Sequence, residues 1–275
     1  MKLKTHFVEK PWGRAQLPAP FDAIAAQAGL GGKTIGEVWF EPEDGTQLPL
    51  LVKYIFTSEK LSVQVHPTDA QGHARGLPGG KTECWYILDA EPGANLGLGT
   101  VKPLDGEALR AAALDGSIEQ LMDWKAVKPG EFYFVPAGTV HAIGVGVSLI
   151  EIQQNVDVTY RLYDYGRPRE LHLDDGVAVS VAKPYPMGMA RRVGGACEEQ
   201  LLSDCVGFTV VYSKDVVQTH QHFIGRALWI VPLSGAVHCC GETAAPGGCL
   251  YVEPDGELTA DPGTTALVGA APRLT

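Results

Sequence analysis

The sequence predicts a mainly β protein that folds as an antiparallel sandwich or barrel. Short runs rich in Val, Ile, Tyr and Phe recur along the chain, with Gly and Pro placed closely between them. No apolar run approaches the roughly 20 residues that a membrane-spanning helix needs, although 45% of the residues are hydrophobic. The β-like runs before residue 170 include 50–56, 60–66, 84–88, 131–138, 148–155 and 158–164.

The chain length suits one large β domain or two smaller ones. Residues 106–124 interrupt the β pattern with Ala, Leu and Glu at helical spacing, broken at Asp115–Gly116, and predict a helical insertion. A cluster of Pro, Gly and basic residues at 183–195 predicts a boundary. We therefore expect a first domain over 1–185, which contains the insertion, and a second β domain over 190–275.

The charge balance narrows the classes of partner. The chain has a formal net charge of −10 and no basic run longer than a pair, so we expect neither nucleic acid nor membrane as a partner. An anionic small molecule is compatible, because a few Lys and Arg side chains in a cleft outweigh the global charge locally. The first residues lack the apolar core of an export signal, and the six cysteines form no CxxC pair. We expect a cytoplasmic protein with reduced thiols.

Two possible metal ligands stand two residues apart in the run VQVHPTD. Gln64 and His66 share one face if this segment is a strand, because successive strand residues point to opposite faces. Glu83 follows in the run ECWYIL. Amide oxygen, imidazole nitrogen and carboxylate oxygen all offer a lone pair to a metal ion, so these three residues are candidate ligands.

A fourth candidate ligand lies in the run KPGEFYFVPAGTVHAIG. Gly130 opens a strand, a corner formed by Pro136 and Gly138 ends it, and His141 starts the next strand. In jelly-roll barrels such a corner aims the histidine into the mouth of the barrel. His141 would therefore complete a set of two imidazoles, one carboxylate and one amide.

This ligand set has a definite charge. A divalent ion with one carboxylate and three neutral ligands keeps a net charge of about +1, which polarises a carbonyl or hydroxyl group. Zinc suits these donors, and iron, manganese and nickel are compatible with them as well.

Four segments carry a family resemblance: SVQVHPTD, GKTECWYIL, VPAGTVHAIG and EIQQNVDVTYRLYDYGR. They resemble, in order, the signature segments of the type I mannose-6-phosphate isomerases, which are zinc-dependent cupins. The likeness extends to KPWGR, IGEVWF and LLVKYIF, covers roughly residues 8–170, and is greatest with the short bacterial form. It implies a cupin, or jelly-roll, barrel for the catalytic domain at 1–185, whereas the C-terminal residues match only in their β-like pattern. The helical domain of the longer members is absent, with only 106–124 in its place.

The resemblance also assigns roles to individual residues. It implies one zinc ion per chain, held by the four ligands that the spacing indicates: Gln64, His66, Glu83 and His141. It implies catalytic roles for Arg161, Glu151 and Lys81. It further implies that Lys53 and Ser62 contact the phosphate of a sugar phosphate.

Side-chain alternation along the predicted strands agrees with these roles. Ser62 falls on the same strand face as Gln64 and His66. An inward-facing Arg161 among apolar residues needs an anionic partner. A sugar phosphate or its enediolate would be that partner, and an internal ion pair with Asp157 or Asp164 is the alternative.

The implied reaction interconverts mannose 6-phosphate and fructose 6-phosphate through a cis-enediol or enediolate. The site has to stabilise the negative charge of this intermediate, and zinc and Arg161 would do so electrostatically. Glu151 is the expected general base for the proton on C2, and Lys81 is the alternative. Another cupin metalloenzyme, such as an iron oxygenase, and a non-catalytic sugar-phosphate-binding protein are the alternative functions.

The second module contains a histidine pair with cupin-like spacing, His220 and His222, in the run THQH. The run GGCLYVEPDGELT would be the second cupin motif, and it keeps Pro254 and Gly256. Thr259 stands where that motif needs a histidine. We therefore predict a degenerate cupin that has lost its metal.

Overall fold

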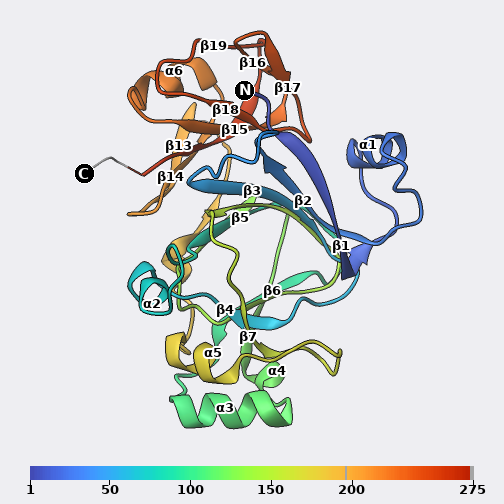
Figure 1. The fold of residues 1–275 in the computed structure, drawn as a ribbon, viewed down its shortest axis with the longest axis vertical. Coiled ribbons are helices and arrows are strands. Elements are labelled where there is room, and N and C mark those ends of the chain that lie inside the picture. Colours follow the sequence, from blue (N-terminus) through green and yellow to red (C-terminus); the bar gives the residue numbers. More distant parts are fainter. Residues whose placement is uncertain (196, 273–275) are drawn as a thin grey trace. The chain divides into compact units, whose positions relative to one another are not determined.

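The computed structural model of the chain describes residues 1–195 and 197–272 (Figure 1). The chain divides into two compact units. The first comprises Met1–Lys10, Arg14–Tyr54 and Arg191–Thr275, and the second comprises Pro11–Gly13 and Ile55–Ala190. No helix among the described residues is long and apolar enough to cross a membrane.

The predicted boundary at 183–195 includes the step between the units at Ala190 and Arg191. Most of the first 54 residues, however, group with the C-terminal residues rather than with 55–190. The assignment of functional domains to 1–185 and 190–275 stays a prediction.

Two sets of antiparallel strands face each other across the core of the second unit. One set has the order β10 (Val147–Gln154), β5 (Glu83–Ala90) and β8 (Glu131–Val135). The other has the order β11 (Tyr160–Tyr163), β4 (Val63–Val65), β9 (His141–Ile143), β6 (Asn95–Thr100) and β7 (Met122–Ala126). Trp85 and Ile87 from β5 share one buried apolar cluster with Leu96 and Leu98 from β6. The prediction of a mainly β, antiparallel sandwich is confirmed.

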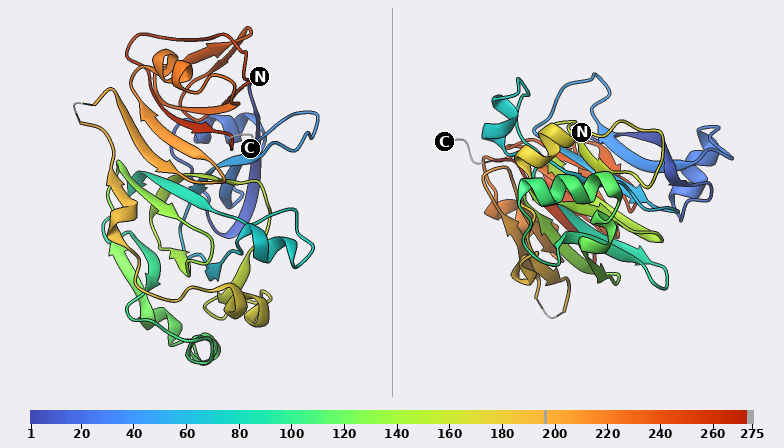
Figure 2. Two further views of the ribbon diagram at one scale, coloured as in Figure 1. Left: turned by 90° about the vertical axis from the view of Figure 1, so that its left-hand side faces the viewer. Right: turned by 90° about the horizontal axis from the view of Figure 1, so that it is seen from below.

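Helices cover the second sheet on the side away from that core (Figures 1 and 2). They are α3 (Gly106–Asp115), α4 (Ile118–Leu121) and α5 (Leu173–Val179), and α2 (Asp69–His73) lies between β4 and β5 in the chain. Val63 and Val65 of β4 pack in one cluster with Leu109 of α3. The predicted helical insertion at 106–124 contains α3 and α4, and Gly116 breaks it with a left-handed φ of 81°. The prediction is wrong for 122–124, because Met122 and Trp124 belong to β7 and pair with β6.

The first unit contains three groups of strands. Most of β1 (Lys4–Arg14) and β3 (Leu50–Phe56) belongs to it, with β2 (Ile35–Glu41) between them. A five-stranded sheet has the order β13 (Glu199–Asp204), β14 (Thr209–Ser213), β20 (Thr265–Ala270), β15 (Leu228–Ser234) and β18 (Leu250–Val252). A three-stranded sheet has the order β17 (Glu242–Ala244), β16 (Val237–Cys239) and β19 (Leu258–Ala260). The remaining elements of the chain are α1 (Phe21–Gln27), α6 (Val216–His222), η1 (Met187–Met189) and β12 (Ala190–Arg192).

The interpretation of THQH as a strand-borne cupin motif is wrong. His220 and His222 lie on α6, whose first turn is capped by Asp215 through the backbone N–H of Gln218. Residues two apart on a helix differ by about 200° in direction, so these two histidines do not share a face. His220 is buried, whereas His222 is exposed and its Nδ1 lies 3.0 Å from Glu199.

Gly80 allows the segment that leaves β4 to pass close to the segment that enters β5. The backbone N–H of Lys81 donates to the carbonyl of Pro67 at 3.0 Å. A Cβ atom on Gly80 would overlap the backbone of Thr68 and Asp69. This close approach places Lys81 and Glu83 directly after the turn.

We expect Gly80→Ala to lower the free energy of unfolding by about 1–3 kcal/mol, because two backbone segments have to separate. Urea unfolding of the variant beside the wild type measures this difference. Gly188→Ala is the matched control, since nothing lies within 4 Å of its Cβ position and it should change stability little. Equal stabilities of the two variants would contradict the argument.

Candidate metal centre

Three predicted ligands converge inside the second unit. Nε2 of His66 lies 3.5 Å from Oε2 of Glu83, and Nε2 of His141 lies 3.4 Å from Oε1 of Glu83. The three ligand atoms lie within 4.8 Å of one another, and each side chain is at most 2% exposed. Two imidazoles and a carboxylate at this spacing could hold a metal ion. The described residues contain no other group of three or more His, Cys, Asp or Glu side chains so placed.

Strand pairing brings the ligands together. Gln64 on β4 lies directly opposite His141 on β9, and opposed residues of antiparallel strands point to the same face. His66 follows β4 at the same parity as Gln64. Glu83 begins β5 in the facing set of strands, where it lies opposite Gln153 of β10.

A backbone carbonyl determines which nitrogen of His141 faces Glu83. Nδ1 lies 2.8 Å from the carbonyl oxygen of Thr139, which can only accept, so Nδ1 donates. Burial lowers the pKa of His141 from 6.5 to about 4, and Lys81 adds to this effect, whereas the Thr139 contact and Glu151 oppose it. The ring is therefore neutral at pH 7, with the lone pair on Nε2. An imidazole whose Nδ1 donates to a backbone carbonyl has its Nε2 lone pair oriented to bind a metal.

Gln64 lies beside the three candidate ligands, but its amide nitrogen rather than its oxygen is next to His141. Its Oε1 accepts a hydrogen bond from Oγ of Ser62 at 3.1 Å, and its Nε2 lies 3.2 Å from Nε2 of His141. A half-turn of the amide would exchange the oxygen and the nitrogen. The role of Gln64 as a fourth ligand stays a prediction.

A buried ammonium links two carboxylates at the site. Nζ of Lys81 lies 3.1 Å from Glu83 and 4.0 Å from Glu151. Nε1 of Trp85 donates to Oε2 of Glu151 at 3.0 Å, and Trp85 and Glu151 are opposed in the register. With neutral imidazoles, two carboxylates and one ammonium leave a net charge of −1. A divalent cation would bring it to +1, which fits the donor set.

Arg161 on β11 lies opposite Gln64 on β4, so the two residues share one face of the sheet. The predicted alternative partner Asp164 does not pair with it. Asp164 is 2% exposed and accepts from Arg167 at 2.8 Å and from Arg169 at 2.6 Å. Burial lowers the pKa of Arg161, and the nearby charge of Arg169 lowers it further. Within the described part of the chain, the guanidinium of Arg161 forms no ion pair, and its Nη1 lies 3.5 Å from the carbonyl of Glu170.

The two predicted phosphate contacts lie in different surroundings. Ser62 is 2% exposed and bonded to Gln64, next to the metal ligands. Lys53 lies on β3 in the first unit, and its ammonium is 4.6 Å from the centroid of the Trp39 ring. The phosphate-binding roles of both residues stay predictions.

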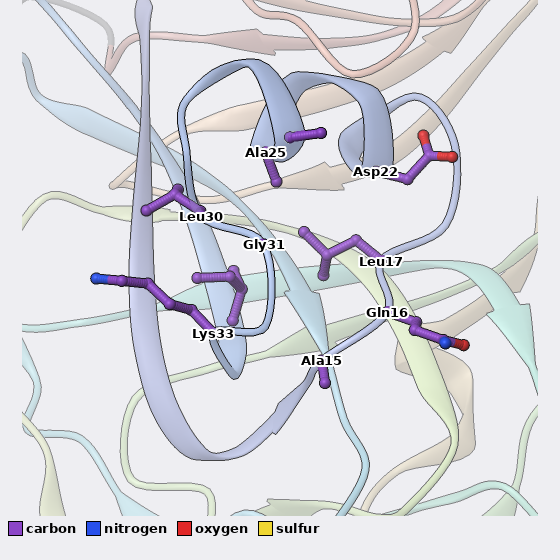
Figure 3. Close-up of a pocket in the computed structure, with 10 residues that line it drawn as sticks. Ala15, Gln16, Leu17, Asp22, Ala25, Leu30, Gly31 and Lys33 are labelled. Atoms are coloured by element: carbon purple, nitrogen blue, oxygen red, sulfur yellow. The ribbon is translucent and has the colours of Figure 1, made fainter.

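The first unit has a cavity of about 390 Å³ beside α1 (Figure 3). Its charged side chains are engaged elsewhere. Nζ of Lys33 lies 2.7 Å from Glu9, and Asp22 accepts from the backbone N–H of Ala23 at 2.7 Å. The cavity therefore offers no group of charges comparable with that around Glu83.

The chain is similar in sequence to known proteins over about half of its length. No family model matches the chain. The chain is 44% identical over 165 residues to the mannose-6-phosphate isomerase ManA of Bacillus subtilis, an alignment that covers 54% of this chain and 51% of the relative. Over this half of its length, the chain is similar to mannose-6-phosphate isomerases. It is also 41% identical over 143 residues to the mannose-6-phosphate isomerase of Streptococcus mutans, covering 50% of this chain and 45% of that protein. By sequence, the chain spans about half the length of the curated relatives it matches.

Solved structures extend the likeness to the whole fold. The crystal structure of the Bacillus subtilis mannose 6-phosphate isomerase matches with a TM-score of 0.71 and 25% identity, over 98% of each chain. A variant of phosphomannose isomerase from Salmonella typhimurium matches with a TM-score of 0.68 over 99% of each chain, and at 15% identity this likeness concerns the fold alone. The predicted cupin-type fold is confirmed.

Two interactions near the site could not be predicted from the sequence. The carbonyl of Thr139 orients His141, but a backbone acceptor leaves no residue-type pattern. Asp164 binds Arg167 and Arg169, and the run DYGRPRE offered only their proximity as a hint.

We expect the metal-free protein to lose stability as the pH falls from 6.5 towards 4. Between these pH values His141 takes up a proton in the unfolded chain but not in the folded one. The free energy of unfolding therefore becomes smaller as the pH falls. The shift corresponds to about 3 kcal/mol by linkage. Urea unfolding after chelation measures it, and metal-free His141→Gln should show a shallower decrease. Parallel curves for the two proteins would contradict this assignment.

Proposed function

We propose that the protein is a zinc-dependent mannose-6-phosphate isomerase that interconverts mannose 6-phosphate and fructose 6-phosphate through a cis-enediol or enediolate. One observation carries the proposal: the buried set of His66, Glu83 and His141 adjoins a second carboxylate, Glu151, across the ammonium of Lys81. Homology over half the chain supports the substrate class. A proton-transfer reaction on a sugar phosphate needs this combination of a cation site and a positioned base.

The donor set favours zinc among the compatible metals. His66, Glu83 and His141 would hold the ion, and Gln64 would add its amide oxygen after rotation. Bound zinc would supply Lewis-acid polarisation of a substrate oxygen without redox chemistry. The local charge of −1 explains why a divalent ion would be retained in so buried a place.

Glu151 is the proposed general base for the proton on C2. Its Oε2 accepts from Trp85, which orients the carboxylate, and Oε1 faces Lys81 at 4.0 Å. At 4% exposure the carboxylate sits in surroundings of low dielectric, where hydration does not weaken it as a base. Lys81 stands between two carboxylates, and this favours its charged form. It would serve as a countercharge and proton donor rather than as the base.

Arg161 would stabilise the negative charge of the enediolate. Asp164 occupies Arg167 and Arg169, and Arg161 itself forms no ion pair within the described residues. A guanidinium in partly buried surroundings interacts strongly with an anion that develops beside it. Ser62 and Lys53 are the proposed phosphate contacts.

We expect the purified protein to isomerise mannose 6-phosphate, to lose activity on chelation and to regain it with zinc. Glu83→Gln should abolish both zinc retention and turnover, because it replaces the charged ligand with a neutral one. A coupled assay for fructose 6-phosphate and metal analysis measure these effects. Glu107→Gln on α3 is the exposed control and should retain both. A folded, zinc-loaded protein that binds the sugar phosphate without turnover would favour the alternative of a binding protein.

We expect Glu151→Gln to lower kcat by about 100-fold or more while the zinc content stays at one per chain. The variant should also stop the exchange of the C2 hydrogen of mannose 6-phosphate with deuterated solvent, which NMR follows directly. Lys81→Gln is the informative partner variant. If Lys81→Gln abolished exchange and Glu151→Gln preserved it, the base would be Lys81.

A further inference from the structure

Two adjacent cysteines occupy the tip of a hairpin in the first unit. β16 and β17 pair antiparallel with Cys239 opposite Glu242, so Cys240 and Gly241 form a two-residue turn. Both turn residues have positive φ angles, 52° and 80°, as a type I′ turn requires. Asn, Asp or Gly normally fills the first of these positions. Only Cys240 and Tyr165 adopt a positive φ among the described residues other than glycine.

The turn brings the two thiols together with very different exposure. The sulfur atoms lie 3.6 Å apart. Cys239 is 3% exposed and belongs to the apolar cluster that includes Val237 and Val252, whereas Cys240 is exposed. Burial raises the pKa of the Cys239 thiol, and its contact with Cys240 raises it further. A reagent would therefore meet Cys240 first and reach Cys239 from there.

The sulfur separation favours one bridging atom over a direct bond between the sulfurs. Most disulfides join sulfurs about 2 Å apart between Cα atoms about 4.4–6.8 Å apart, whereas adjacent Cα atoms lie about 3.8 Å apart, so a direct bond at this turn would be strained. Two sulfurs bound at about 2.3 Å to one bridging atom stand about 3.3 to 3.8 Å apart, as the angle at that atom goes from about 90° in a pyramidal centre to about 110° in a tetrahedral one. The observed 3.6 Å lies in this range.

An atom bound by Cys239 and Cys240 would receive only two ligands from this hairpin, so any further groups bonded to it have to come from outside the protein. Within the described part of the chain, no third His, Cys, Asp or Glu ligand atom completes a group at this hairpin. A closed structural zinc site is therefore not formed. A trivalent metalloid that needs only two sulfur ligands and carries its own organic group satisfies this condition.

We propose that Cys239 and Cys240 form a dithiol site that captures monosubstituted trivalent arsenicals and related thiophilic metalloids. With phenylarsenous acid, PhAs(OH)₂, two As–S bonds form while two As–O and two S–H bonds break. Two waters leave, and arsenic stays trivalent, so no oxidant or reductant is needed. The inference is independent of the proposed isomerase activity, because both thiols lie in the first unit. Nitrogen and oxygen ligands at Glu83 suit a harder cation than this dithiol does.

The test uses the full chain and phenylarsine oxide at one equivalent, followed by intact-protein mass spectrometry. The wild type should gain one phenylarsenic group less two hydrogens per chain. That adduct should withstand an excess of a monothiol and be removed by a dithiol such as dimercaptopropanol. The candidate metal site in the second unit contains no cysteine, so bound zinc should not change the number of arsenical groups per chain.

Cys240→Asn is the decisive variant, because it removes one thiol and places a favoured residue in the turn. It should lose the monothiol-resistant adduct completely and show a raised Tm, so that misfolding does not explain the loss. Cys197→Ser removes an exposed thiol elsewhere and should keep the adduct. A resistant adduct in Cys240→Asn, or none in the wild type, would overturn the proposal. Closure of a Cys239–Cys240 disulfide by mild peroxide without arsenical binding would overturn it as well.

Discussion

The candidate site depends on a carboxylate that is buried with its partners. Glu83 is 1% exposed, and an isolated carboxylate in that position would cost several kcal/mol in lost hydration. Lys81 offsets this cost with an ammonium at 3.1 Å, and the two imidazoles approach from the other strands. The arrangement keeps one negative charge in excess when Glu151 is counted. A divalent cation would bring the net charge of this group to about +1.

Strand register is what holds these partners in place. Gln64 meets His141 because β4 and β9 pair at that position, and Arg161 meets Gln64 because β11 pairs with β4. Trp85 orients Glu151 for the same reason on the facing strands. A slip of one residue in any of these pairs would turn the side chain to the opposite face. The apolar cluster that contains Trp85 and Leu96 makes such a slip costly, since it would expose buried side chains.

The arginines of β11 and the loop after it differ in their partners. Asp164 is almost fully buried and accepts hydrogen bonds from both Arg167 and Arg169. Arg167 also pairs with Glu59 at 3.3 Å, so two carboxylates partly offset the charges of these two arginines. Arg161 forms no ion pair among the described residues, and partial desolvation lowers its pKa. The ion pairs of this loop leave the proposed role of Arg161 open to an anionic ligand.

Much of this protein follows from local sequence. Alternation along KLSVQVH and EFYFVPAG predicts strands and the faces of their side chains, and Gly116 predicts the break between α3 and α4. The types of three ligands, His66, Glu83 and His141, indicate a metal before any fold is known. These predictions succeed because strand periodicity, turn residues and ligand chemistry are properties of short segments.

Only the tertiary structure decided which groups meet. Gln64 and His141 are 77 residues apart, and no local pattern specifies their pairing or the turned amide of Gln64. The neutral, Nδ1-protonated form of His141 comes from burial and the Thr139 carbonyl. THQH has strand-like spacing but lies on a helix whose first turn is capped by Asp215. Asp164 likewise pairs with Arg167 and Arg169 rather than with Arg161, because the loop after β11 brings those two arginines to it. Register, burial and partner choice depend on contacts distant in the chain, which the sequence does not specify by itself.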